Sequence, residues 1–324
     1  MARTSTAAMQ KAGGPKLHSK RYYRFREIFP LALMALPGVV YLIINNYIPI
    51  SGLVVAFKNF SYQDGIWGSP WADPLLKNFK FLFMTSDAWV MTFNTLFYNI
   101  LFIILNTVLP IIVAIFLNEV RSKAMGKVYQ TVILTPYLIS MVIISYIAYG
   151  FLAGDTGLIN KSILEPLGLN TISWYSDAPK WRFILPIINT WKSLGFYTVV
   201  YYASIVGIDP QYYEAAQLDG ANRFQQAIHI TLPCLKPTII TMVLIAIGKV
   251  FYSDFGLFYN VPMNSGMLFS TTQTIDTYVY RALMNIGNIG MAAAAGFYQS
   301  IVGFILVLTA NLVVRKIDKD NALF

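Results

Sequence analysis

Two lysines stand inside long apolar segments of this chain, where water cannot solvate a charge. They are Lys192 and Lys249, and the aromatic and acidic residues Trp191, Tyr197, Tyr252 and Asp254 lie within five positions of one or the other. A lysine at the centre of a membrane helix costs about 2.5–3.5 kcal/mol on insertion scales, and such residues usually face a cavity or a partner. Sugars stack on aromatic faces with polar groups at the rim, and an ammonium group also attracts acidic sugars. These six residues are therefore candidates for a solute path.

Two other interpretations of the lysines stay open. Lys249 could pair with a carboxylate on another helix or on a second subunit, or either lysine could extend toward the membrane surface. Asp254 lies five positions after Lys249, which places it about 140° away on a continuous helix. The sequence alone does not choose between a solute path and an internal ion pair.

The sequence offers little for a disulfide, a metal site or a nucleotide-binding site. Cys234 is the only cysteine, so the chain has no internal disulfide, and its two histidines, His18 and His229, lie far apart. A His/Cys metal site is not expected. No Gly-x-x-x-x-Gly-Lys-Ser/Thr phosphate-binding sequence occurs, so we expect a non-enzyme, with any ATP hydrolysis in another chain.

The elements that carry these residues are long apolar helices. The chain has 324 residues, of which 56% are hydrophobic and only 12% charged, against about 25% charged in soluble domains. Six apolar runs have the roughly 20-residue length that spans a bilayer. They cover residues 29–50, 93–117, 128–151, 182–204, 238–258 and 291–314. The sequence predicts an all-α polytopic membrane protein, kinked where Pro37, Pro110, Pro136 and Pro186 fall within the runs.

Charge placement gives the orientation. With the N-terminus inside, fifteen Lys and Arg residues fall in inner segments and seven in outer ones, as expected for cytoplasmic termini. We therefore predict a basic cytoplasmic tail at 1–27, a six-helix domain at 28–315 with a cytoplasmic loop at 205–237, and a cytoplasmic tail at 316–324. The net charge of +9 follows this pattern, and no basic stripe or fold motif predicts nucleic-acid binding.

The cytoplasmic loop predicts two short helices around a glycine. Asp209 is a good N-cap and Pro210 suits the first helical position, so a helix should cover 211–218. Gly220 can take the left-handed conformation that ends a helix, and 221–231 can form a second one. This compact knob could seat in a groove of another protein, or it could be an ordinary connection.

The loop resembles the EAA loop of binding-protein-dependent ABC importers, which have the MetI-like fold. The matching positions are Glu214, Ala215, Ala216, Asp219, Gly220, Ile230, Leu232 and Pro233. The resemblance extends along most of the chain to the polysaccharide-permease branch named for LplB-type proteins. It rests there on residues 47–60 (YIPISGLVVAFKNF), 65–71 (GIWGSPW), 156–169 (TGLINKSILEPLGL) and 276–281 (DTYVYR).

This resemblance implies a permease subunit in a bacterial inner membrane. Its partners would be a second homologous permease, two ATP-binding subunits that hold ATP and Mg²⁺, and an extracytoplasmic solute-binding protein. The cargo would be an oligo- or polysaccharide, including an acidic one such as alginate. The helix around Glu214 would sit in a cleft of the ATPase.

The last outer connection adds four candidates for docking the binding protein or closing an outer gate. They are Asp276, Tyr278, Tyr280 and Arg281. An ion pair at the rim is the alternative for the two charged members.

Two other classes of function were weighed against the importer. An ion-coupled secondary transporter or channel would be expected to carry membrane carboxylates, and the spans are nearly free of Asp and Glu. An integral membrane enzyme would cluster His, Asp or Cys at one membrane face, and the sequence has no such cluster.

Overall fold

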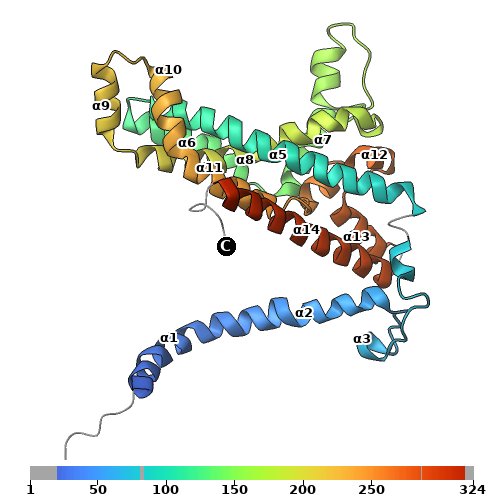
Figure 1. Cartoon of the computed structure of the whole chain (residues 1–324). Coiled ribbons are helices and arrows are strands. Elements are labelled where there is room, and N and C mark those ends of the chain that lie inside the picture. The colour runs from blue at the N-terminus through green and yellow to red at the C-terminus, as the bar shows by residue number, and fades with distance from the viewer. Residues whose placement is uncertain (1–19, 81–83, 286, 318–324) are drawn as a thin grey trace, which may run out of the picture. The chain divides into compact units, whose positions relative to one another are not determined.

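The computed structural model describes residues 20–80, 84–285 and 287–317, and these residues form helices, turns and loops without a named strand (Figure 1). The all-α prediction is therefore confirmed for the described residues. The predicted tails lie largely outside them, at residues 1–19 and 318–324. The chain divides into two compact units, residues 1–52 and 53–324.

The first unit is one helical run. It comprises α1 (Lys20–Leu42), a π-helical turn at Ile43–Tyr47 and α2 (Ile48–Ile50). Its apolar side chains from residue 28 onward are exposed, Met34 by 80%. The predicted span at 29–50 lies within this run, and the helical path continues to Phe57 through a 3-10 segment at Ser51–Phe57.

The second unit is built on two long helices, α5 (Ser86–Asn118) and α8 (Ala178–Val206), which pack against each other more extensively than any other described pair. Tyr98, Trp181 and Leu185 are fully buried between these two helices and residues 257–268. A second cluster joins α5 to α13 (Ile275–Met284) and α14 (Ile289–Ile317) through Met91, Ile275 and Ala294. Helices α5, α8, α13 and α14 thus form the packed core of the second unit.

The predicted span at 128–151 is not one helix. It consists of α6 (Lys123–Leu138) and α7 (Met141–Leu152), which meet at 94°. Ile139 and Ser140 are extended, and the Ser140 hydroxyl caps α7 by accepting from the Ile143 amide at 3.4 Å. The bend follows Pro136, the one predicted kink that coincides with a helix break. A serine N-cap starts a new helix, which the apolar pattern alone could not signal.

The predicted span at 238–258 also differs from the structure. Its helix, α11 (Leu232–Ile247), ends eleven residues before Phe258. Residues 248–255 form a turn segment, and a π-helical turn follows at Gly256–Asn260. Lys249 therefore lies in a turn rather than inside a helix.

The predicted count of six spans remains a prediction. By length and composition, four described helical segments can cross a membrane, or five if α6 and α7 form one bent span. Helix α8 is long enough but carries Lys180, Arg182 and Lys192, which lower its mean hydropathy.

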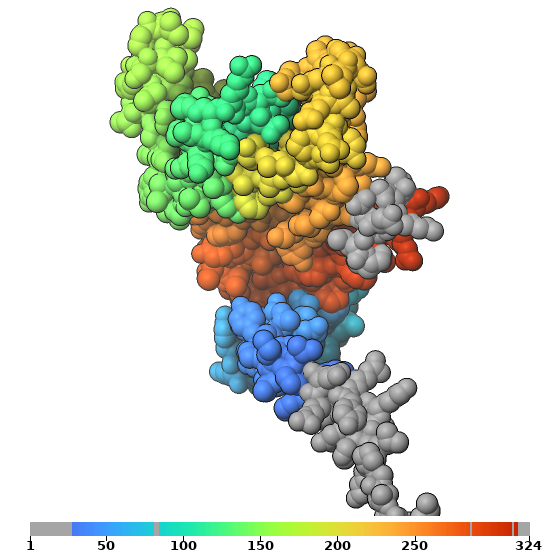
Figure 2. Space-filling view, turned by 90° about the vertical axis from the view of Figure 1, so that its left-hand side faces the viewer, coloured from blue at the N-terminus to red at the C-terminus, as the bar shows by residue number. Residues whose placement is uncertain are grey.

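Short elements fill the connections. The 205–237 loop holds α9 (Pro210–Leu218), α10 (Arg223–Gln226) and a π-helical turn at Ala227–Thr231, which leads into α11. Figure 2 shows this segment as a lobe that projects from the second unit. The other connections hold α3 (Gly65–Gly68), α12 (Phe269–Thr272), 3-10 turns at Lys77–Phe79, Trp174–Ser176 and Gly266–Leu268, and a π-helical turn at Ile159–Leu164.

Candidate functional site

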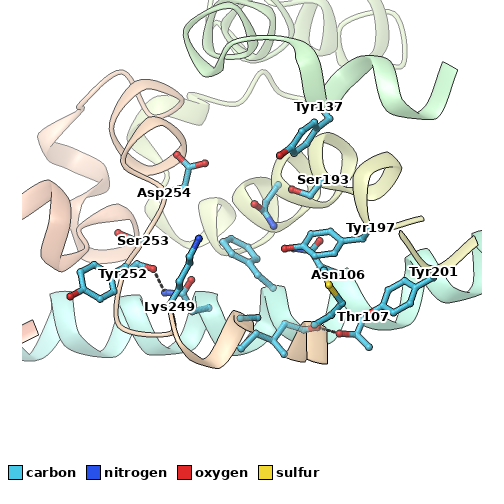
Figure 3. Close-up of a pocket in the computed structure, with 16 residues that line it drawn as sticks. Asn106, Thr107, Tyr137, Ser193, Tyr197, Tyr201, Lys249, Tyr252, Ser253 and Asp254 are labelled. Carbon is cyan, nitrogen blue, oxygen red and sulfur yellow. Dashed lines mark hydrogen bonds between the residues drawn. The ribbon is translucent and has the colours of Figure 1, made fainter. Parts of the chain in front are cut away.

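A polar cavity of about 480 Å³ lies within the second unit, between α5, α6, α8, α11 and the 248–255 turn. Figure 3 shows its side chains converging from these elements. Its polar and aromatic lining consists of Asn99, Phe102, Asn106, Thr107, Tyr137, Asn189, Ser193, Tyr197, Tyr201, Lys249, Tyr252, Ser253 and Asp254. The predicted path residues Tyr197, Lys249, Tyr252 and Asp254 are thus brought together at one site.

Several polar atoms at the cavity wall have no partner. Among the described residues, Asn189 is 7% exposed and its Nδ2 has no acceptor, and Asn106 Oδ1, on the facing helix α5, has no donor. Buried polar atoms normally find partners. These two atoms are closed to solvent in this structure, so they are unused hydrogen-bonding capacity within the cavity wall. Asparagines within apolar spans are the sequence signal for this lining, and the predicted path residues do not include them.

Lys249 is the cationic member of the cavity wall. Its ammonium group extends into the open space between the turn and α8 (Figure 3), and no carboxylate of a described residue lies within ion-pair distance of it. Asp254 accepts the Leu257 amide at 3.1 Å and so caps the next turn. Because the segment is a turn and not a helix, both side chains reach the same cavity, contrary to the 140° separation expected from helical geometry.

The 248–255 turn is held by three side chains from other helices. Asn99 of α5 donates to the carbonyls of Val250 and Tyr252, at 2.9 and 3.0 Å. Gln299 of α14 donates to the Phe251 carbonyl at 2.7 Å. Non-helical backbone at membrane depth is tolerated only where protein groups satisfy it, and these bonds supply that condition.

Asp276 of α13 is the third side chain that holds the 248–255 turn. Its Oδ2 accepts both the amide and the hydroxyl of Ser253, each at 2.7 Å, and both carboxylate oxygens accept from Gln299, at 3.1 and 3.2 Å. Asp276 was predicted as a docking or gate residue, with a rim ion pair as the alternative. Among the described residues it forms no ion pair with Arg281 and instead holds the cavity turn.

Lys192 was a candidate for the solute path, but its ammonium group binds backbone carbonyls and does not line the cavity. Its ammonium group donates to the carbonyls of Pro136, Tyr137 and Ile139, at 3.5, 3.1 and 2.5 Å. These carbonyls end α6, where the helix dipole is negative. Lys192 therefore ties α8 to the break between α6 and α7. Neither Lys192 nor its 44%-exposed neighbour Trp191 lines the cavity, so their role in a solute path stays a prediction.

The other outer candidates pack within the last connection. Arg281 donates to Asn264 Oδ1 at 3.2 Å, and its guanidinium lies 4.1 Å from the centre of the Phe269 ring. Burial lowers the pKa of Arg281, yet arginine keeps its proton in proteins. Tyr278 donates to the Met291 sulfur, and the Tyr280 ring lies 4.7 Å from that of Phe255. Their docking role stays a prediction.

The loop around Glu214 has the expected local structure. Asp209 Oδ1 accepts the Gln211 amide at 2.9 Å and begins α9. Gly220 has a φ of 81°, and the Ala221 amide donates to the Ala216 carbonyl at 2.8 Å. This is the left-handed closure that favours glycine at a helix end.

The exposed face of this loop suits contact with another protein. Glu214 is exposed, Leu218 is 90% exposed and Phe224 is 73% exposed. The second helix begins at Arg223 rather than at residue 221, because Asn222 and Gln225 form a capping box. Tyr213 joins Thr231 by a 2.9 Å hydroxyl contact, which fixes α9 against the segment that carries Ile230, Leu232 and Pro233.

Comparison with known proteins places the chain among transport components. Residues 12–319 match the family model described as "Binding-protein-dependent transport system inner membrane component". Protein LplB of Bacillus subtilis (strain 168) is 35% identical over 291 residues, which cover 90% of each chain. The polygalacturonan/rhamnogalacturonan transport system permease protein YteP of the same organism is 35% identical over 293 residues, covering 90% of this chain and 89% of YteP.

A solved structure extends the similarity to the fold. A chain in the crystal structure of a bacterial alginate ABC transporter, in complex with an alginate pentasaccharide-bound periplasmic protein, superposes with a TM-score of 0.81. The two chains are 32% identical, and the match covers 92% of this chain and 98% of that chain. The expected MetI-like fold is confirmed.

Proposed function

The chain belongs to the family of binding-protein-dependent transport system inner membrane components, and from that premise we propose that it forms half of an ATP-driven import path for an oligo- or polysaccharide. Its proposed partners are a second homologous permease, two ATP-binding subunits and an extracytoplasmic solute-binding protein. ATP and Mg²⁺ would be bound by the partner ATPase. The proposed location is the bacterial inner membrane, with both termini in the cytoplasm, as the charge distribution favours.

The chemistry of the cavity is the observation that carries the proposed cargo. A saccharide presents many hydroxyl groups, each able to donate and accept hydrogen bonds. The amide and hydroxyl groups of Asn106, Asn189 and Ser193 in the cavity wall include both donors and acceptors. The rings of Tyr197 and Tyr252 offer faces for stacking. The cavity thus matches sugar chemistry better than the chemistry of an inorganic ion.

Lys249 supports an acidic saccharide within this class. Its ammonium group has no carboxylate partner among the described residues, and a uronate carboxylate would supply one. The relatives agree with this chemistry, since YteP is named for polygalacturonan and the structural neighbour for alginate.

The proposed cycle is alternating access. The projecting helix α9 would transmit closure of the ATPase pair to the membrane helices, and the cavity would face alternately outward and inward. Glu214 would offer its carboxylate to a polar or basic group of the ATPase. Gly220 would permit the bend that presents α9 to it, because a residue with a Cβ is strained at its φ of 81°.

Uptake by the complete importer in proteoliposomes tests the cargo. Lys249→Met should reduce uptake of a uronate oligosaccharide about tenfold or more, since a hydrogen bond to a charged group is worth about 1.5–3 kcal/mol. Uptake of a neutral oligosaccharide of equal length should change little. Lys127→Met, at an exposed position on α6, is the matched control.

Equal losses for the acidic and neutral sugars would contradict charge recognition by Lys249. Uptake that continues without ATP would contradict the importer mechanism and would favour an ion-coupled transporter instead.

A further inference from the structure

The side of the cavity that carries Lys249 is held only in part by its own helix. Helix α11 ends at Ile247, and the amides of Lys249 and Val250 donate to the Ala246 and Ile247 carbonyls, each at 3.0 Å. The rest of the 248–255 turn is bound by side chains from other parts of the chain. Asn99 fixes the turn to α5, and Gln299 fixes it to α14. The contact to Asp276 is different, because α13 is a short helix of ten residues in the connection before the last helix.

The contact between Asp276 and Ser253 consists of hydrogen bonds to a carboxylate. A carboxylate that accepts hydrogen bonds forms shorter and stronger ones than a neutral acceptor does. Asp276 accepts from both the amide and the hydroxyl of Ser253 at 2.7 Å, and the Thr274 hydroxyl lies 2.7 Å from the Ser253 hydroxyl oxygen. Thr274 is fully buried and caps α13. The start of α13 and the cavity turn are thus joined at one residue.

The opposite end of α13 is open. Leu283 and Met284, at its C-terminal end, are 40% and 63% exposed, whereas Ile275 at its start is fully buried and donates its amide to Thr95 of α5 at 3.1 Å. A partner can therefore reach this ten-residue helix at Leu283 and Met284, while Ala282 and the start of the helix are packed within the protein.

We propose that Asp276 is a positioning residue that couples displacement of α13 on the outer face to the cavity turn that bears Lys249 and Asp254. Because Asp276 binds both the amide and the hydroxyl of Ser253, displacement of α13 must either move the turn or break this contact. The proposal rests on the proposed function for the partner, the solute-binding protein, but it does not depend on the identity of the sugar.

Labelling of the turn tests the coupling directly. In a Cys234→Ser background, Tyr252→Cys, in the turn and 44% exposed as tyrosine, is reacted with an impermeant maleimide in the reconstituted importer. Adding the loaded binding protein should change the labelling rate severalfold when Asp276 is present. Asp276→Asn should abolish that change, and it should reduce stimulation of ATPase activity by the binding protein while basal ATPase activity persists. Asp155→Asn, at an exposed position in another connection, is the control with the same charge change.

A milder variant keeps the proposal testable if Asp276→Asn fails to fold. Ser253→Ala removes the hydroxyl that donates to Asp276 but keeps the hydrogen bond from the backbone amide of residue 253. It should give a partial loss of stimulation, and the double variant with Asp276→Asn should be no worse than Asp276→Asn alone, because both changes act through one contact.

Additive effects of the two substitutions would overturn the proposal. So would an unchanged labelling rate in the parent protein, or a normal response of Asp276→Asn at normal abundance. Failure of the proposed cargo would appear separately, as equal losses of acidic and neutral sugars in Lys249→Met.

Discussion

The ammonium group of Lys192 donates to the Tyr137 carbonyl at 3.1 Å, across the gap between α8 and the end of α6. The lysine thus satisfies the backbone at one helix break, as Asn99, Gln299 and Asp276 do at the other. Both breaks lie beside the polar cavity, because Tyr137 precedes one and Lys249 follows the other. The two broken helices thus contribute Tyr137 and residues from 249–254 to a polar lining whose other members come mainly from the unbroken helices α5 and α8.

Replacing Lys192 by methionine should destabilise the protein. The carbonyls of Pro136, Tyr137 and Ile139 would lose their shared donor, and a hydrogen bond to a charged group contributes about 1.5–3 kcal/mol. The temperature at which half of the detergent-purified protein aggregates should fall by several degrees.

Lys180→Met on the same helix is the matched control for that variant. Lys180 bonds Asp177 in a partly exposed pair, and exposed pairs contribute only about 0–1 kcal/mol. If both substitutions lowered the aggregation temperature equally, the structural role of Lys192 would be refuted.

Asn99→Leu should lower stability by about 2 kcal/mol or more. Leucine has nearly the same size but cannot donate to the carbonyls of Val250 and Tyr252, and those carbonyls have no helical partner. Asn106→Leu, two turns further along α5, replaces a side chain whose Oδ1 is unpaired and should cost less stability while reducing sugar uptake. Thermal aggregation and uptake measured on both variants separate the two roles, and a reversed order would contradict them.

Gly195→Ala should separate α6 from α8. A Cβ at this position would lie 2.0 Å from the Ile133 carbonyl oxygen, which is backbone and cannot move aside. Overpacking of this kind costs about 1–3 kcal/mol. Gly150→Ala in α7 meets nothing within 4 Å and should be neutral or stabilising, because alanine is the better helix former by about 1 kcal/mol. Expression level and aggregation temperature of the two variants provide the comparison.

Glu214→Ala and Gly220→Val should uncouple the ATPase without unfolding the permease. The first removes an exposed carboxylate, and the second places a β-branched residue at a φ of 81°, a conformation that such residues avoid. We expect reduced co-purification of the ATPase and loss of sugar-stimulated ATP hydrolysis in liposomes.

Gln217→Ala, also exposed on α9, is the control for the coupling loop. Wild-type assembly and stimulated turnover in both Glu214→Ala and Gly220→Val would rule out a coupling role for this loop.

The sequence alone determined the class of fold and the shape of the projecting loop. Long apolar runs with few charges can exist only as membrane helices, and Asp209 and Gly220 carry local signals that begin and end α9 wherever the helix is placed. These features depend on interactions between near neighbours in the chain, so a pattern of residue types suffices to predict them.

Only the tertiary structure decided which polar residues meet. The backbone at the break after α6 is bound by Lys192, and the backbone just beyond α11 is bound by Asn99, Gln299 and Asp276. Each of these side chains is distant in sequence from the backbone it binds. An apolar run continues past such a break without any change in composition, so helical periodicity placed Lys249 and Asp254 on opposite sides. The turn brings both to one cavity, because hydrogen bonds from three other helices are sufficient to stabilise backbone that a lone helix could not leave unpaired.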